Sequence, residues 1–409
     1  MDGENSRLNT TIERLTGLQW RGQGPAFLVG LGHGATHWII ASFYVLLPFI
    51  AKDLGLTYAQ AGGLITIFHT AAFAANAGSG AVVDISGRRV LVLSASLVVG
   101  AGALMAVGLM GKAFWLVPLV VLIGITNNTW HPAAISYLSI SYPENRGYAL
   151  SIHSLGASFG DMVSPLAAGA ILLWLTWQGT ASLSALPVFA VAAILLVFLP
   201  RSHSTGETES EPRLSLSAYL SGLIDLVRNR AIIGLSIMSG FRLMTQNGLL
   251  VFLPLYLVDV MLVSPIVLGV AMMGMQIGGI VAGPIAGILS DRIGRQPIVF
   301  GSLTATTVII IGLTMISNVA LFIIIVVLLG FVLLAVRPVI HSWAMDMTPD
   351  EMSGSTISLL FATQSAFSAL VPLVGGIIAD AWGLSSVFYA LAVAMVAANV
   401  MVYFLPDPR

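Results

Sequence analysis

Cysteine is absent from this chain of 409 residues, and charged residues are scarce. The absence of thiols excludes disulfide bonds, zinc–thiolate sites and iron–sulfur clusters, and it leaves the redox compartment undetermined. Only 9% of the residues are charged, against about a quarter in soluble globular proteins, and 57% are apolar. A water-soluble body of this size needs far more polar surface, whereas lipid does not, so the composition indicates a membrane protein.

Several other features are missing as well. The chain contains no Gly-x-x-x-x-Gly-Lys-Ser/Thr phosphate loop, so ATP is not expected to be its energy source. It has no polar segment long enough for a separate catalytic domain. Its net charge of -1 gives no signal for nucleic-acid binding. We therefore expect neither an enzyme nor a bound cofactor, and no nucleic-acid partner.

Apolar runs long enough to cross a hydrocarbon layer of ~30 Å are abundant. Twelve of them cover residues 25–51, 57–83, 89–111, 113–138, 147–174, 180–199, 231–258, 264–289, 297–317, 319–345, 354–380 and 384–405. The alternating pattern of a transmembrane β-barrel is absent. The first run is too long for a signal-peptide core, so we expect it in the mature protein. The sequence thus predicts an all-α membrane protein with twelve transmembrane helices.

Lys and Arg are unevenly distributed over the connections between these runs. With a cytoplasmic N-terminus, thirteen of them lie inside and two, Lys52 and Lys112, lie outside. By the positive-inside rule, both termini are predicted to be cytoplasmic. The expected organisation is a tail over 1–24, a six-helix bundle over 25–199, a cytoplasmic linker over 200–230 and a second six-helix bundle over 231–405.

The two halves repeat each other. Gly80, Asp84, Gly87 and Arg88 recur as Gly287, Asp291, Gly294 and Arg295, each 207 positions later, and Pro132 recurs 206 positions later as Pro338. Such a shared register predicts parallel repeats with a substrate site near mid-membrane between them. The first glycine of each copy would permit close helix approach, the second a tight turn, and the Asp–Arg pair would latch the cytoplasmic side. The alternative is that these residues are only interfacial charges.

The duplicated loop resembles the signature of the major facilitator superfamily, and the resemblance covers nearly the whole chain. It implies two six-helix bundles that work by alternating access. Local strings are most similar to the fosmidomycin-resistance group of drug exporters; they are Gly32-His33, Leu46-Leu47-Pro48, Leu54-Gly55-Leu56-Thr57, His131-Pro132-Ala133, Ser151-Ile152 and the stretch from Gly156 to Pro165. This chain departs from that group at His37 and Ala133, where the group carries acidic residues.

Polar side chains at membrane depth are the candidates for a site, because a charge at a helix centre costs at least ~2.5–3.5 kcal/mol. We expect substrate binding by His33, His37, His69, Asn127, His131, Arg242, Gln246, Arg337 and His341. Asp161, with His37, is the candidate for proton coupling. His33 and His37 share one helix face, but the sequence fixes no third ligand, so no metal site is predicted.

Each candidate also has a structural explanation. Arg242 could pair with a buried acid, for which Asp161 is the candidate, and Arg337 could extend to the inner interface. Asp161 could be a structural acid. His131 could satisfy backbone groups freed by Pro132, and His153 and His341 are expected to be structural. By position along the helices, His33 is expected near the membrane midplane and His131 in the cytoplasmic half.

The leading interpretation is a monomeric secondary transporter of the bacterial inner membrane. It would couple protons to the export of a small organic anion or drug, since two arginines and several histidines make a cationic cavity. Its partners would be the substrate, protons and the lipid bilayer. One alternative is an importer of an organic anion or a metal chelate, and another is a non-transporting sensor on a transporter scaffold.

Overall fold

The computed structural model describes residues 18–110, 112–200, 228–348 and 353–406. A 3₁₀ turn, η1 (Trp20–Gln23), precedes twelve long helices: α2 (Gly24–Leu54), α3 (Tyr58–Ser86), α4 (Arg89–Met110), α5 (Ala113–Ser141), α6 (Arg146–Ile171), α7 (Trp177–Phe198), α9 (Arg230–Asp259), α10 (Pro265–Ile293), α11 (Arg295–Leu313), α12 (Val319–Asp346), α13 (Ser353–Trp382) and α14 (Leu384–Phe404). The described residues contain no strand. The predicted spans match these helices to within about one turn, so the all-α prediction is confirmed.

Of the twelve long helices in the described part of the chain, ten are long and apolar enough to cross a membrane. The other two, α3 and α6, have sufficient length, but polar residues interrupt their apolar windows. His69 lies within α3, and His153 and Asp161 lie within α6. Polar groups at membrane depth require partners inside the protein, so these two helices are where a functional site is expected.

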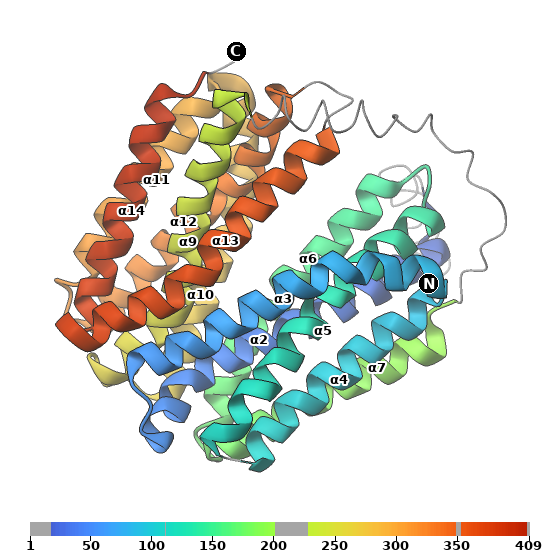
Figure 1. Cartoon of the computed structure of the whole chain (residues 1–409), viewed down its shortest axis with the longest axis horizontal. Coiled ribbons are helices and arrows are strands. Elements are labelled where there is room, and N and C mark those ends of the chain that lie inside the picture. The colour runs from blue at the N-terminus through green and yellow to red at the C-terminus, as the bar shows by residue number, and fades with distance from the viewer. Residues whose placement is uncertain (1–17, 111, 201–227, 349–352, 407–409) are drawn as a thin grey trace, which may run out of the picture. The chain divides into compact units, whose positions relative to one another are not determined.

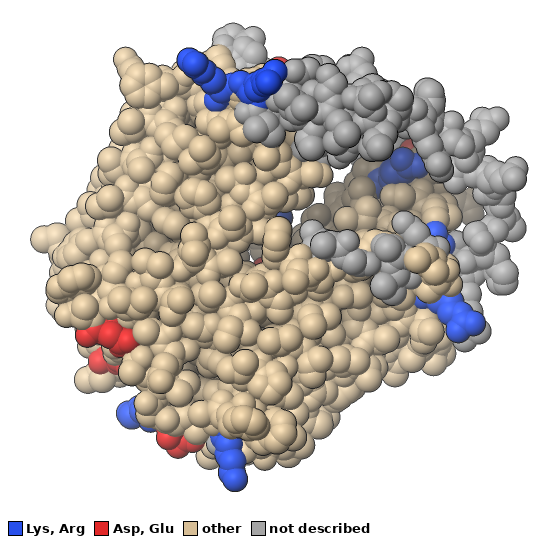
Figure 2. Space-filling view, in the orientation of Figure 1, with Lys and Arg blue, Asp and Glu red and all other residues tan. Residues whose placement is uncertain are grey.

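Most of the described surface on the face drawn in Figure 2 carries no charged side chain, and the charged side chains gather towards the margins. Large apolar side chains such as Phe114, Leu262 and Val393 are highly exposed. In water such a surface would drive association, but in a bilayer these side chains contact lipid tails.

The chain divides into two compact units. Of the described residues, the first contains 18–46, 70–110 and 112–200, and the second contains 47–69, 228–348 and 353–406. In the first unit, α4 packs against α5 and α7; in the second, α10 packs against α12, α9 against α13 and α14, and α11 against α14 (Figure 1). The sequence-based division at the 200–230 linker remains a prediction.

Helices α2 and α6 of the first unit contact each other through a glycine seam, which we define as Gly30 and Gly34 on α2 with Gly156 and Gly160 on α6. A Cβ atom added at Gly156 would lie 1.9 Å from the carbonyl oxygen of Gly30, and one at Gly160 would lie 2.2 Å from that of Gly34. No side chain fits in these gaps. The seam therefore brings the two backbones into direct contact, as small residues four apart do in membrane helices.

Candidate transport site

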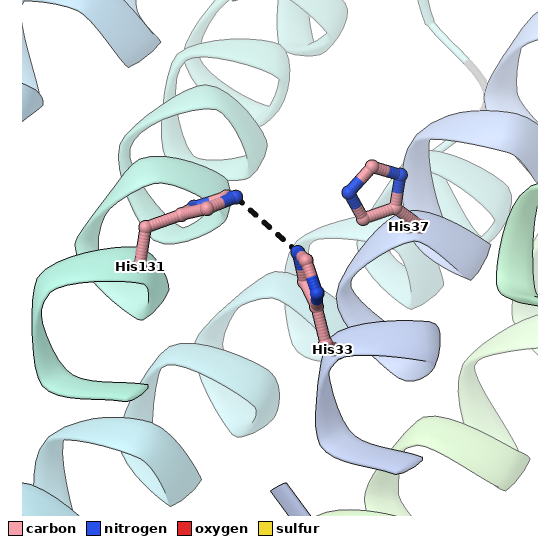
Figure 3. Close-up of side chains that lie close together, drawn as sticks. All are labelled: His33, His37 and His131. Carbon is pink, nitrogen blue, oxygen red and sulfur yellow. Dashed lines mark hydrogen bonds between the residues drawn. The ribbon is translucent and has the colours of Figure 1, made fainter. Parts of the chain in front are cut away.

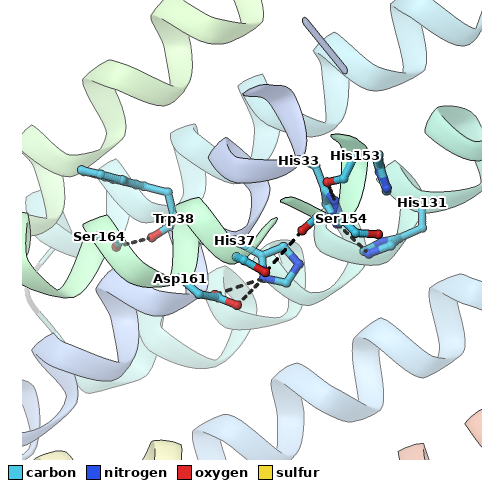
Figure 4. A network of polar contacts seen from close by, with 9 residues as sticks. His33, His37, Trp38, His131, His153, Ser154, Asp161 and Ser164 are labelled. Atoms are coloured by element: carbon cyan, nitrogen blue, oxygen red, sulfur yellow. Dashed lines mark hydrogen bonds and ion pairs between the residues drawn. The ribbon is translucent and has the colours of Figure 1, made fainter. Parts of the chain in front are cut away.

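The glycine seam brings polar residues of α2 and α6 together inside the first unit. His33 and His37 on α2 face His153 and Asp161 on α6, and α5 adds His131 (Figure 4). We call these four histidines and Asp161 the histidine cluster. Its members come from three helices, and the i, i+4 spacing of His33 and His37 places both on the same face of α2.

His37 and Asp161 form a hydrogen-bonded pair. The Nδ1–H of His37 donates to both carboxylate oxygens of Asp161, each at 3.0 Å. The two side chains are 27% and 28% exposed, so neither is sealed inside the unit. One turn further along α6, the Ser164 hydroxyl donates to the carbonyl oxygen of Trp38 at 3.0 Å and fixes the local register of the two helices. Helix packing thus holds the two side chains in place, and their partial exposure leaves them accessible for proton exchange with water.

His33 lies at the centre of the cluster and is 6% exposed. Its Nδ1 donates to the carbonyl oxygen of His153 at 2.8 Å, because a carbonyl oxygen can only accept. Its Nε2 lies 3.3 Å from the Nε2 of His131, and its ring stacks on the ring of His153 with a centroid distance of 3.7 Å. His33 therefore contacts both of the other helices.

The rings of His33 and His131 touch, although the two residues are on different helices. The depths expected for them, near the midplane for His33 and in the cytoplasmic half for His131, stay predictions. His153, expected to be structural, belongs to the cluster, and its Nε2 has no hydrogen-bond partner among the described residues.

Two asparagines on α5 have different roles. Asn127 reaches the histidine cluster through its carbonyl oxygen, which accepts from the Nδ1 of His131 at 3.0 Å. Asn128 donates from its side-chain amide to the carbonyl oxygen of Ala72 on α3 at 2.7 Å. The carbonyl that Pro132 leaves unpaired by lacking an N–H is that of Asn128, one residue further along α5. Satisfaction of that group by His131 as well stays a prediction.

A second group of polar residues lies in the second unit. Arg242 on α9 is 2% exposed, and its Nε and Nη2 donate to the carbonyl oxygen of Leu333 on α12 at 3.2 and 2.6 Å. Arg337 and His341 follow on α12, and Arg337 is close enough to repel the Arg242 charge. Within its own unit, as described, Arg242 has no carboxylate at ion-pair distance. Asp161, the predicted partner acid, instead pairs with His37.

Two further candidates lie in the second unit. The Nε2 of His69 and the Oε1 of Gln246 are both buried and have no hydrogen-bond partner among the described residues. Gln246 lies one turn from Arg242 on the same face of α9. A buried amide oxygen without a partner is costly, and a hydrogen-bond donor on a ligand would relieve that cost.

The second copy of the duplicated loop motif forms a polar network. Arg295 donates to the carboxylates of Asp291 and Asp346 and to the hydroxyl of Ser290. Gly294 has φ +99°, and its counterpart Gly87 has φ +59°, so both turns use a conformation that favours glycine. The sequence motif does not predict a role for Asp346, which lies outside the motif at the end of α12.

The first copy of the motif is only partly visible. The side chain of Asp84 lies outside the described residues. Arg89 donates from its Nε to the Ser136 hydroxyl at 2.8 Å. A Cβ atom at Gly80 or Gly287 would meet nothing within 4 Å among the described atoms, so the close helix approach expected at these glycines is not found there.

Comparison with known proteins identifies the class. The family model described as Major Facilitator Superfamily matches residues 26–273 and 235–409, which together span both halves. The chain therefore belongs to the major facilitator superfamily, and it is a membrane transporter rather than an enzyme. The resemblance inferred from the duplicated loop is confirmed at this level.

Two curated relatives cover almost the whole chain. The multidrug efflux pump Tap of Mycolicibacterium fortuitum is 24% identical over 95% of this chain and 97% of its own length. The uncharacterized MFS-type transporter YfnC of Bacillus subtilis is 24% identical over 93% of this chain and 92% of its own.

Solved structures share the fold. A bacterial homolog of the human lysosomal transporter Spinster, in an inward-facing, unoccupied conformation, matches with a TM-score of 0.77 at 17% identity, covering 95% of this chain and 96% of that one. A mutant of the nucleoside transporter NupG matches with a TM-score of 0.76 at 12% identity, covering 93% of this chain and 99% of that one.

Proposed function

We propose that this transporter exports a small organic anion or drug across the bacterial inner membrane, driven by protons that enter through His37 and Asp161. Both chain termini lie in the cytoplasm in this proposal, as the distribution of Lys and Arg predicts. Export is supported by Tap, whose name describes a multidrug efflux pump. The resemblance of the local strings to drug exporters of the fosmidomycin-resistance group supports the same direction.

The burial of Arg242 carries the proposal of an anionic substrate. A guanidinium has five N–H donors, and here two of its nitrogens share the single carbonyl oxygen of Leu333. A buried cation without a counter-ion is strongly unfavourable, and Arg337 adds to the positive potential. A carboxylate or phosphonate on the substrate would supply both the charge and the acceptors that Arg242 lacks within its unit.

Proton coupling through His37 and Asp161 is supported by their geometry. A carboxylate and an imidazole at hydrogen-bond distance can carry a proton, provided that water reaches them. Both side chains are more than a quarter exposed, which meets this requirement. Asp161 also places a carboxylate next to the first helix. In this chain His37 stands where the drug-exporter group has an acidic residue on that helix.

We further infer that the two loop motifs act as a latch on the cytoplasmic side. The network of Arg295 with Asp291 and Asp346 supports this role for the second copy, because it ties the α10–α11 turn to the end of α12. Charge-assisted bonds of this kind hold a turn more firmly than neutral ones.

Counterflow in proteoliposomes, screened with organic anions, phosphonates and cationic drugs, tests the substrate class. The affinity of the best anion is then compared in Arg242→Lys, which keeps the charge but loses the planar fork, and in Arg242→Ala. We expect a loss of about tenfold or more in affinity for Arg242→Lys and a larger loss for Arg242→Ala.

Arg230→Lys, at the exposed start of α9, is the matched control and should bind normally. Counterflow of cations alone would contradict the anionic substrate. So would an unchanged affinity for every anion in well-folded Arg242→Lys protein.

A further inference from the structure

The geometry of the histidine cluster points to a metal site: the Nε2 atoms of His33, His37 and His131 together bind one divalent transition-metal ion of the Zn²⁺ or Co²⁺ type. One ligand nitrogen from each of these residues lies within 4.8 Å of the others (Figure 3). The inference goes beyond the proposed function, because it assigns a ligand that neither the substrate class nor the direction of transport requires.

The hydrogen bonds fix which nitrogen of each ring faces the site. Nδ1 of His33 donates to the His153 carbonyl oxygen, Nδ1 of His131 to the Asn127 carbonyl oxygen, and Nδ1 of His37 to the Asp161 carboxylate. A neutral imidazole carries only one N–H. In the neutral rings each Nε2 therefore carries the lone pair with which it can bind a cation.

The contact between His33 and His131 has the geometry for such a cation. Their Nε2 atoms are 3.3 Å apart, and when both rings are neutral and donate from Nδ1, a proton or a metal ion between the two nitrogens relieves the repulsion of their lone pairs. Ligand nitrogens ~2.05 Å from a tetrahedral metal ion lie ~3.3 Å from each other, so this pair already has the spacing of two ligands. His37 completes the set by a rotation of its partly exposed side chain towards the other two rings.

The surroundings of the three rings are those of a metal site. A histidine ligand usually donates its second N–H to a carboxylate or a backbone carbonyl, which orients the ring and makes the ligand nitrogen more basic. All three rings have such a partner here. Three protein ligands leave a fourth position for water, so the ion can exchange, unlike an ion in a closed structural site.

Imidazole ligands select among metals. Nitrogen donors favour Zn²⁺, Co²⁺, Ni²⁺ and Cu²⁺ over Mg²⁺ and Ca²⁺, which prefer oxygen ligands. The carboxylate of Asp161 accepts a hydrogen bond from His37, so it orients this ligand and does not bind the metal ion itself. The ligand is therefore a borderline-soft divalent ion.

Titration of the purified full-length chain with Co²⁺ tests the site, because a tetrahedral Co²⁺ complex has a characteristic visible spectrum. The affinity tag must be free of histidine and the protein treated with a chelator beforehand. We expect one ion per chain and a weakening of at least about tenfold in each of His33→Ala, His37→Ala and His131→Ala. His69→Ala, which removes a buried histidine outside the cluster, should bind like the unmodified protein.

Weak Co²⁺ binding in His131→Ala could also result from misfolding. The variant His131→Cys distinguishes the two explanations. The chain has no cysteine, so this variant carries a single thiol, and thiolate is a ligand for Co²⁺ and Zn²⁺. If position 131 is a ligand, Co²⁺ will produce a sulfur-to-cobalt charge-transfer band. His69→Cys, with its thiol elsewhere, should show no such band.

Absence of a tetrahedral spectrum in the unmodified protein would overturn the site. Unchanged affinity in His33→Ala and His131→Ala would do so too, as would a missing charge-transfer band in folded His131→Cys. These readouts are equilibrium binding, and they stay valid whether or not the protein transports organic anions. A failed counterflow screen with intact Co²⁺ binding would reject only the proposed substrate.

Discussion

Asp161 and His37 contact each other in the first unit. The sequence names both as candidates for proton coupling, because each is an ionisable residue within an apolar run. It does not predict their direct hydrogen bond, because the two residues are 124 positions apart and on different helices, and it offers Asp161 as the partner of Arg242 instead. The structure gives Asp161 a histidine rather than an arginine as its counter-charge. A histidine gains and loses its charge near neutral pH, whereas an arginine keeps it.

Replacement of Asp161 by Asn tests its role in coupling. Asn keeps the size and can still accept from His37, but it cannot carry a proton. We expect Asp161→Asn to lose uphill transport in proteoliposomes with a pH gradient while substrate counterflow persists. The assay is run with a chelator present, so that bound metal does not contribute.

Glu144→Gln, which neutralises an exposed acid before α6, is the control and should accumulate substrate normally. If Asp161→Asn still concentrates substrate against a gradient, Asp161 is structural and the coupling site is elsewhere.

Other contacts cannot be predicted from the sequence either, because they join different helices. The acceptor of Arg242 is a backbone carbonyl, that of Leu333, and a backbone group leaves no mark in the sequence. The third metal ligand, His131, is supplied by α5, 98 positions from His33. Spacing within a helix predicts a shared face, but it says nothing about which other helix covers that face.

At the scale of helices, α2 and α6 are held together by the glycine seam. Two of its four glycines, Gly156 and Gly160, fell within a string that resembled drug exporters, yet the sequence alone did not indicate which helix they contact. The pairing follows from the structure, where carbonyl oxygens of α2 occupy the space of absent side chains. The predicted helix boundaries, by contrast, were accurate because apolar run length is a local property.

Gly156→Ala tests the seam. The added methyl group would lie 1.9 Å from a backbone oxygen, so α2 and α6 must separate. Overpacking of this kind costs ~1–3 kcal/mol, and we expect a lower melting temperature in detergent. Co²⁺ binding should weaken as well, because His33 loses the carbonyl oxygen of His153 that orients its ring.

Gly102→Ala is the matched control. It lies within α4, where a new Cβ atom would meet nothing within 4 Å, and Ala favours a helix more than Gly does. Its melting temperature should stay the same or rise. Equal melting temperatures for Gly156→Ala and the unmodified protein would contradict the tight contact.

For the molecule as a whole, the sequence predicted the class of fold from composition, twelve apolar runs and a repeat at a fixed interval of 207 positions. These signals are strong because lipid imposes length and polarity on every crossing helix. The arrangement of polar groups inside the units is not subject to such a rule. It depends on which helices touch, and this is why the fold was predictable and the site only in part.

Topology is the prediction that belongs to the whole chain. The absence of cysteine makes single thiols easy to introduce without background. In intact cells, Lys112→Cys should react with a membrane-impermeant thiol reagent, and Ser210→Cys, in the predicted cytoplasmic linker, should react only after the membrane is opened. The reverse labelling pattern would overturn the proposed orientation.

The glycine seam also has a mechanical consequence. Because backbone touches backbone along it, α2 and α6 behave as a double rod that carries His33, His37, His153 and Asp161 at fixed mutual positions. We expect the two helices to move together when the first unit moves during transport. A proton shared by His37 and Asp161 then travels with both helices and does not pass from one helix to the other.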